Sequence, residues 1–123
     1  MDMAKQRQTE HGELLKGNTP TLLLAVLLQG PLHGYAIARE IERRSKEALS
    51  LGEGSLYPAL RMLESDGLVV SRWEPQPSGP ARKVYELTEA GRAEIVARTR
   101  SWREFVEAVE NVIGGPLHVS QPI

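Results

Sequence analysis

The hydrophobic positions near the start of the chain predict two helices in close succession. Thr19, followed by proline, is typical of an N-cap with proline in the first turn, and the almost uniformly apolar residues 21–29 predict a core helix. A second helix is predicted from residues 33–35 onward. Ile37 and Ile41 lie one turn apart there, and charged residues cover the other side.

A third helix is predicted to begin near residues 53–55. Pro58 supports this start, because proline is tolerated where a backbone N–H is not needed, in the first turn. Gly67 is a natural left-handed cap that ends the helix. One apolar stripe with i, i+4, i+7 spacing marks its buried side: Leu56, Leu60 and Leu63.

Alternating and β-branched residues then predict a pair of strands. Residues 68–74 and 83–87 flank a turn-rich segment, 75–81, so they are expected to form a hairpin with a long tip. Thr88 is placed to cap a final helix, 89–113, which the glycines that follow it end.

The order of these elements predicts a mainly α fold with a β-hairpin wing, that is, a winged helix-turn-helix followed by a long C-terminal dimerisation helix. A helix of this kind fits the major groove of B-DNA, which is about 12 Å wide. We expect an N-terminal arm at 1–12, of the kind that is often disordered at chain ends, a DNA-binding domain at 13–87, the dimerisation helix at 88–113 and a flexible tail at 114–123.

The final helix carries apolar residues at a and d spacings, interrupted by Arg98. The winged-helix core is too short to cover this stripe, so a second chain is expected to cover it in an isologous dimer. Trp102 has two interpretations: a core residue of that interface, or a stacking surface for a flat aromatic effector. The predicted interface consists of Ile95, Trp102, Phe105, Val106, Val109 and Val112.

Composition narrows the possible functions. The chain has 123 residues, a net charge of −1 and no cysteine, which excludes disulfides and thiolate metal sites. The longest apolar run, 22–28, is too short for a membrane span, and the polar N-terminus lacks a signal-like apolar region, so a cytoplasmic protein is expected. His11, His33 and His118 are scattered singly, and no catalytic motif occurs. We therefore predict no enzyme, no cofactor and no metal site.

Candidate DNA contacts lie on the third helix. Tyr57 and Arg61 are four residues apart, so they share a face that points away from the leucine stripe. A phenol and a guanidinium there suit phosphates or base edges; the alternative is a solvated face with Tyr57 half-buried against the wing. Ser55, near the helix start, suits a phosphate or a simple cap. Pro58 is interpreted as structural first, with contact to a thymine methyl as the second reading.

The wing supplies concentrated positive charge. Arg82 and Lys83 follow its loop, and no acidic residue lies between Pro75 and Tyr85. They suit phosphates or the minor groove; the alternative is a charged edge that blocks strand pairing. Arg72 is expected to join them from the first strand, and Trp73 is expected to pack the wing.

Two helix starts are further candidates for phosphate contact. Lys16, Asn18 and Thr19 precede the first predicted helix, and Gly34 and Tyr35 open the second. Helix N-termini of this kind often bind the phosphates that flank the major groove, but the same residues also serve as plain caps.

Five blocks, in order and correctly spaced, carry a family resemblance. The sequence resembles the short, PadR-like members of the PadR family of winged-helix transcriptional regulators. Members of the family usually have a pair of tyrosines at the wing, and this chain departs from that pattern because Val84 takes one of the two positions. The blocks are residues 33–35, 54–60, 63–68, 79–85 and 87–92.

The resemblance implies a transcriptional repressor. In some members of the family, a small aromatic compound releases the repressor from DNA. The expected partners are double-stranded DNA with a pseudo-palindromic operator, a second copy of the chain and, as in some members of the family, a small aromatic effector. A winged-helix dimer that acts as a ligand-binding or protein-interaction module with weak DNA affinity is the alternative, because the chain is nearly neutral.

Overall fold

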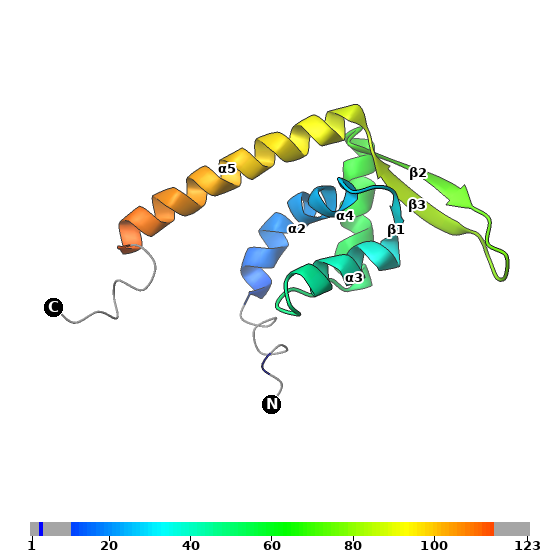
Figure 1. The fold of residues 1–123 in the computed structure, drawn as a ribbon, viewed down its shortest axis with the longest axis horizontal. Coiled ribbons are helices and arrows are strands. Elements are labelled where there is room, and N and C mark those ends of the chain that lie inside the picture. Colours follow the sequence, from blue (N-terminus) through cyan, green and yellow to red (C-terminus); the bar gives the residue numbers. More distant parts are fainter. Residues whose placement is uncertain (1–2, 4–10, 115–123) are drawn as a thin grey trace.

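A computed structural model describes residues 3 and 11–114 of the chain. Its elements are α2 (Gly12–Leu27), β1 (Leu32–His33), α3 (Gly34–Arg44), α4 (Glu53–Ser65), β2 (Val69–Glu74), β3 (Arg82–Leu87) and α5 (Glu89–Ile113). In Figure 1, α2, α3 and α4 cluster together, the β2–β3 hairpin projects to one side, and α5 runs out to the other. The mainly helical fold with a hairpin wing is confirmed. The predicted arm and tail lie almost entirely outside the described residues.

The first helix starts earlier than the sequence predicts. α2 already runs through Thr19, which is a buried helical residue rather than an N-cap, and Pro20 lies inside the helix. Proline removes one backbone N–H from the helical ladder. Neighbouring side chains bond to the ladder here, because the Thr19 hydroxyl donates to the Leu15 carbonyl (3.0 Å) and Asn18 Nδ2 donates to the Leu14 carbonyl (2.7 Å). Asn18 and Thr19 therefore do not stand at a helix start.

Lys16, the third residue of that predicted group, also lies within α2. Phosphate contact at a helix N-terminus needs free backbone N–H groups, and these belong to the first turn alone. The interpretation of this group as a phosphate clamp is therefore wrong.

The sheet has three strands in the order β1–β3–β2, all antiparallel neighbours. β1 was not predicted: it is two residues long, and it pairs Leu32 with Tyr85 and His33 with Val84. β2 and β3 form the predicted hairpin, in a register that places Trp73 opposite Lys83. The register decides which side chains share a face, and the loop sequence alone did not specify it.

The core lies where α2, α3, α4, the sheet and the start of α5 meet. Apolar residues one turn apart in each helix point into it, as their spacing predicts. Gly34 and Ile37 show that α3 also buries its first turn. The buried cluster comprises Leu23, Leu24, Val26, Leu27, Ile37, Ile41, Leu56, Ala59, Leu60, Leu63, Val69, Tyr85, Leu87 and Ile95.

The predicted start of α4 near residues 53–55 is confirmed, but the argument that placed Pro58 in the first turn is wrong. The helix begins at Glu53, so Pro58 is its sixth residue and lies beyond the first turn. Its missing N–H leaves the Gly54 carbonyl without its usual helical partner. The end is as expected: Gly67 follows the helix with a φ of 76°.

The junction between the sheet and α5 is tightly packed. The Thr88 hydroxyl accepts a bond from the Gly91 N–H (3.0 Å) and donates to the Gly67 carbonyl (2.7 Å), which confirms the predicted cap. A Cβ on Gly91 would lie 2.1 Å from the Leu68 carbonyl oxygen, so only glycine fits here. This contact fixes the direction in which α5 leaves the domain.

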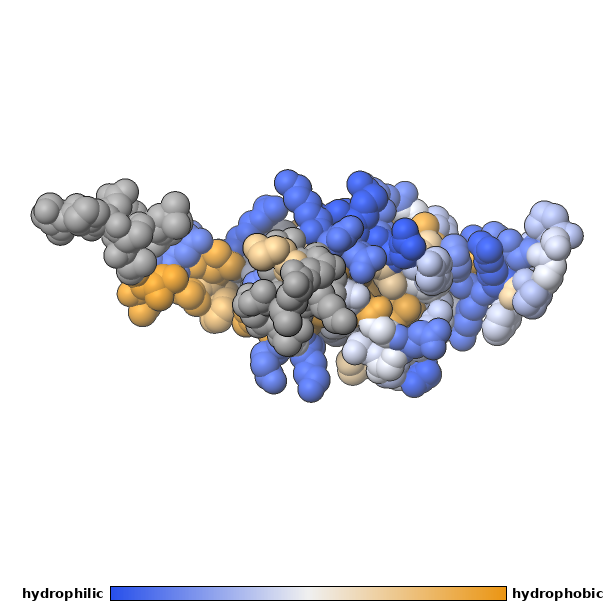
Figure 2. All heavy atoms as spheres, turned by 90° about the horizontal axis from the view of Figure 1, so that it is seen from below, coloured by the Kyte–Doolittle hydropathy of each residue, from blue (hydrophilic) through white to orange (hydrophobic). Residues whose placement is uncertain are grey.

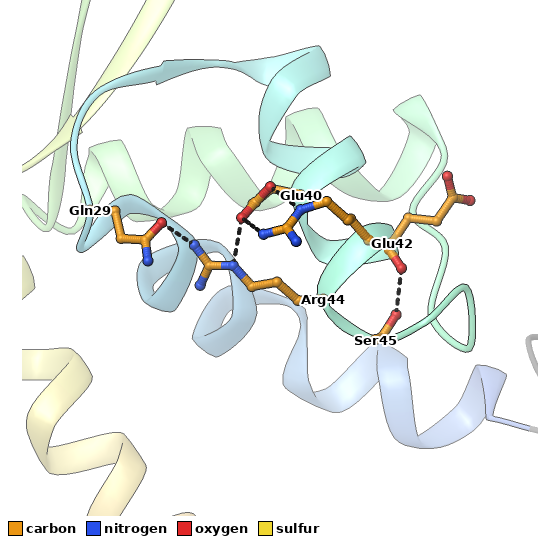
Figure 3. A network of polar contacts seen from close by, with 6 residues as sticks. Gln29, Glu40, Glu42, Arg44 and Ser45 are labelled. Atoms are coloured by element: carbon orange, nitrogen blue, oxygen red, sulfur yellow. Dashed lines mark hydrogen bonds and ion pairs between the residues drawn. The ribbon is translucent and has the colours of Figure 1, made fainter.

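A polar network ties α3 to the end of α2 (Figure 3). Arg43 binds both oxygens of Glu40, Arg44 donates to the same carboxylate (2.7 Å), and Arg44 also donates to Gln29 (2.6 Å). The two guanidiniums lower the pKa of Glu40 to about 2. Its negative charge is therefore matched locally, and the outer face of α3 is not acidic. Ser45 stands at the C-terminal end of α3, where its hydroxyl donates to the Glu42 carbonyl.

Candidate nucleic-acid interface

α4 is the second helix of the helix-turn-helix unit, and one of its sides is open to solvent. The predicted leucine stripe is buried, as expected. The other side carries the predicted Ser55, Pro58 and Arg61, all of them exposed. Met62 joins them with 52% of its surface exposed, although the sequence did not single it out. This side offers one guanidinium and one hydroxyl with two apolar groups, a set suited to base edges and thymine methyls.

Tyr57 is only half-buried, and it connects α4 to the start of α3. Its ring lies directly against Gly34: a Cβ there would be 2.7 Å from both Cε1 and the hydroxyl oxygen of Tyr57. The ring also packs against the core. A side chain at residue 34 would therefore displace the Tyr57 ring, and Tyr57 combines this packing role with a partly exposed position on α4.

The two faces of the wing differ, because successive strand residues point to opposite sides. Ser71 lies on the face toward α4, where its hydroxyl donates to Glu64 (2.5 Å). Trp73 and Lys83 lie on this same face, one step farther out. The Lys83 ammonium sits 5.9 Å from the ring centre of Trp73 and 5.8 Å from that of Tyr85. Lys83 therefore extends the surface of α4 onto the wing.

Tyr85 shows how closely α4 approaches this face. Burial raises the pKa of its phenol, the Glu64 carboxylate and Tyr57 raise it further, and Arg61 lowers it. The hydrogen bond from Ser71 to Glu64, together with the pairing of Ser71 with Tyr85, places this phenol on the wing face toward α4.

Arg72 points the other way. Its guanidinium donates to Glu86 (2.9 Å) and lies 3.8 Å from Glu74, both on the face away from α4. The strand alternation that brings Lys83 beside α4 takes Arg72 to the opposite side. The prediction was that Arg72 joins Arg82 and Lys83: Arg72 shares its strand face with Arg82, but Lys83 lies on the opposite face.

Arg82 lies on that outer face too, but it adjoins the start of α3. A hollow of about 820 Å³ is lined there by Tyr35, Arg39, Arg43 and Arg82, among others. Tyr35 is 62% exposed, and Arg39 donates to its hydroxyl (3.2 Å) while lying 5.8 Å from its ring centre. Tyr35 and Arg82, two predicted contacts far apart in sequence, thus share one cationic hollow.

The structure overturns one prediction about the wing. Trp73 was expected to pack against the hairpin, but 68% of its surface is exposed. On this face the core cluster ends at Tyr85, which pairs with Ser71, so the Trp73 ring lies beyond it, with the Lys83 ammonium 5.9 Å from the ring centre. The exposure of Trp73 follows from its pairing with Lys83 at the outer end of the hairpin, and this pairing depends on the strand register.

α5 contains a second exposed apolar surface, on its C-terminal half. Ile95 does not belong to it: this residue is 1% exposed and lies in the core of its own chain, so its assignment to the dimer interface is wrong. Farther along, the helix leaves α2, and apolar side chains gather near its end (Figure 2). We name this surface the distal stripe; its exposed members are Trp102, Phe105, Val109, Val112 and Ile113, with Val106 partly exposed.

A mainly apolar hollow of about 420 Å³ adjoins the distal stripe. Leu14, Leu22 and Leu49 contribute to its walls, and Trp102 closes it from α5. The Trp102 and Phe105 rings lie 6.3 Å apart, centre to centre. Trp102 is thus both part of the stripe and a wall of a hollow.

The described residues contain neither a membrane-spanning helix nor a metal-binding cluster. No helix there is long and apolar enough to cross a membrane. Within the same residues, no group of three or more His, Cys, Asp or Glu side chains is arranged to hold a metal ion.

Comparison with known proteins agrees with this geometry. The profile of the transcriptional regulator PadR-like family matches residues 23–97. A transcriptional regulator of Mycobacterium tuberculosis is 38% identical over 72% of this chain and 77% of its own, and the negative transcriptional regulator PadR of Bacillus subtilis is 29% identical over 59% of this chain and 40% of its own.

Solved structures show the same likeness. A PadR family regulator from Clostridium difficile is 33% identical, with a TM-score of 0.67 over 80% of this chain and 99% of that one. A PadR family regulator from Eggerthella lenta is 28% identical, with a TM-score of 0.75 over 85% and 89%. The chain belongs to the PadR-like family of winged-helix transcriptional regulators.

Proposed function

We propose that this chain is a homodimeric repressor that reads a pseudo-palindromic operator through α4 and the wing and is released by a small aromatic compound. The observation that carries the proposal is the placement of two cations on adjoining elements: Arg61 is exposed on α4, and Lys83 lies on the wing face that Ser71 bonds to α4. A nearly neutral protein needs its positive charge on one side to bind DNA, and this surface supplies it.

α4 is the element we assign to the major groove. Arg61 is placed to donate to a guanine or a phosphate, and Ser55 to bind a phosphate near the helix start. Pro58 and Met62 offer apolar contact to thymine methyl groups. Tyr35 and Arg82 in their hollow are assigned to the phosphates beside the groove.

The distal stripe is the surface we assign to a second copy of the chain. Its aromatic and branched residues recur at a and d spacings, which suit helix pairing, and an isologous contact covers both copies at once. Such a dimer presents two α4 helices about one DNA turn, or about 34 Å, apart.

The effector is assigned to the hollow walled by Trp102. Its lining is mainly apolar and includes an aromatic ring, the chemistry that a flat aromatic compound requires. Because Trp102 also belongs to the distal stripe, a ligand there would act on the dimer contact itself. Repression fits the negative regulator of Bacillus subtilis among the relatives.

The test compares two arginines with opposite positions. Arg61→Ala should weaken binding to a duplex selected from random DNA by about 1–3 kcal/mol, or about 5- to 150-fold. Arg72→Ala, the control from the outer wing face, should change affinity less than twofold. Equal losses would contradict the proposed orientation. Weak, sequence-independent binding by the unmodified protein would instead favour the ligand-binding or protein-interaction alternative.

A further inference from the structure

Trp73 is a large apolar side chain that the fold leaves uncovered. It is 68% exposed, whereas the next residue of β2 on the same face, Ser71, is bonded to α4. Burial of an aromatic side chain stabilises a fold in proportion to the apolar area removed from water, so this exposed position gains little from folding alone. Its place on the wing, next to the proposed DNA surface, indicates a contact with a partner.

The neighbour of Trp73 indicates what kind of partner fits. The Lys83 ammonium lies between the rings of Trp73 and Tyr85, at 5.9 and 5.8 Å from their centres. Cation–π contact with two rings holds the charge in one place on the wing. The surface therefore combines a flat apolar ring with a fixed positive charge.

The charges of the two wing faces favour the same partner. The strand residues that face α4 include one cation, Lys83, and no carboxylate, as the alternation of β2 and β3 shows. The outer face carries two carboxylates, Glu74 and Glu86, and two guanidiniums, Arg72 and Arg82, so the charges of its strand residues cancel. The strand residues toward α4 keep one net positive charge, at Lys83, while the nearby Glu64 of α4 accepts a hydrogen bond from Ser71.

We propose that the indole of Trp73 lies against the deoxyribose wall of the minor groove next to the groove that α4 occupies, while Lys83 binds the adjoining phosphate. This inference rests on the proposed function, since it extends the same surface along the duplex. Sugar faces in the minor groove are apolar and phosphates flank them, so an apolar ring beside an ammonium group, as on the wing, offers a partner to each.

The two side chains should respond differently to salt, which gives the test its power. Neutralising one phosphate contributes about 0.9 to the slope of log affinity against log salt. Lys83→Ala should therefore lower affinity and reduce this slope by about 0.9. Trp73→Ala should lower affinity at least fivefold at every salt concentration, with the slope unchanged.

Two variants complete the design. Val70→Ala, at an exposed apolar residue of β2 on the opposite face, is the matched control and should bind within twofold of the unmodified protein. Trp73→Phe keeps a ring under Lys83 and should retain most of the affinity. The fluorescence of Trp73 is the part of the signal that Trp73→Phe removes. Acrylamide should quench this part less when the selected duplex is added.

The contrary outcomes are distinct. Unchanged affinity in Trp73→Ala, or a Trp73 signal quenched equally with and without DNA, overturns the inference. A slope loss in Trp73→Ala equal to that of Lys83→Ala also overturns it, because the ring would then only hold the lysine. If the unmodified protein binds no selected duplex, or if Arg61→Ala has no effect, the proposed function itself fails.

Discussion

The two halves of α5 have similar apolar periodicity but opposite surroundings. In the first half, Gly91 and Ile95 are buried against the sheet and core of the same chain. In the second half, Trp102, Phe105 and Val112 follow the same spacing but are 46%, 61% and 86% exposed. Figure 1 shows the reason: α2 lies below the middle of α5 and diverges from it, and the far part of α5 extends beyond the cluster of helices.

The difference shows that apolar periodicity predicts which residues of a helix will be buried, but not whether the same chain or a second chain covers them. A heptad pattern predicts one apolar stripe along the whole helix. The length and direction of α2 decide where the stripe stops being a core. The first half of α5 therefore contributes to folding, and the second half is free for association.

The largest expected effect separates the halves by stability. Ile95→Ala should reduce the free energy of unfolding by about 2–5 kcal/mol, because it removes buried methyl groups and leaves a cavity. Val96→Ala, at the neighbouring position, is 58% exposed and should change stability by less than about 0.5 kcal/mol. Urea unfolding followed by circular dichroism measures both, and equal losses would erase the distinction.

The second prediction concerns association. Phe105→Asp should abolish the dimer while leaving the monomer folded, because the ring is 61% exposed in a single chain and a charge there opposes apolar pairing. Sedimentation should give the mass of one chain, 13.6 kDa, with an unchanged far-ultraviolet spectrum.

A polar neighbour provides the control for that experiment. Glu104→Gln alters an exposed residue on the other side of the helix and should remain dimeric. A Phe105→Asp protein that still sediments as a dimer would show that the distal stripe is not the interface.

The smallest expected effect lies at the boundary between the halves. Arg98 donates to Glu94 one turn earlier (2.6 Å), and both side chains are partly exposed. Such pairs contribute about 0.3–0.5 kcal/mol. A double-mutant cycle with Arg98→Ala and Glu94→Ala should return a coupling energy of that size, whereas a value above about 1.5 kcal/mol would place Arg98 in a buried interaction that joins the two halves.

Much of the fold could be predicted because the caps and breaks encoded by neighbouring residues lie at the same positions as the ends of the packed helices. The start at Gly34, the cap at Thr88 and the end of α4 before Gly67 each depend on a few neighbouring residues, and all are confirmed. Pro20 misled the prediction, because proline favours a helix start but can also stand inside a helix when side chains satisfy nearby carbonyls. β1 escaped notice because two residues carry no periodicity.

The candidate site was harder to predict because it depends on pairing across the chain. The sequence identifies Arg61 and Lys83, but not that Arg72 faces away from them or that Trp73 is uncovered. Those facts follow from the strand register, which a seven-residue loop at 75–81 leaves open. The hollow shared by Tyr35 and Arg82 likewise requires β1 to pair with β3.

Selection of bound duplexes from random DNA tests the central claim most directly. Two chains joined along their distal stripes should enrich pseudo-palindromic sequences whose half-site centres lie about 10 base pairs apart, matching two α4 helices on one side of the duplex. Enrichment of a single asymmetric half-site, or no enrichment at all, would contradict the account.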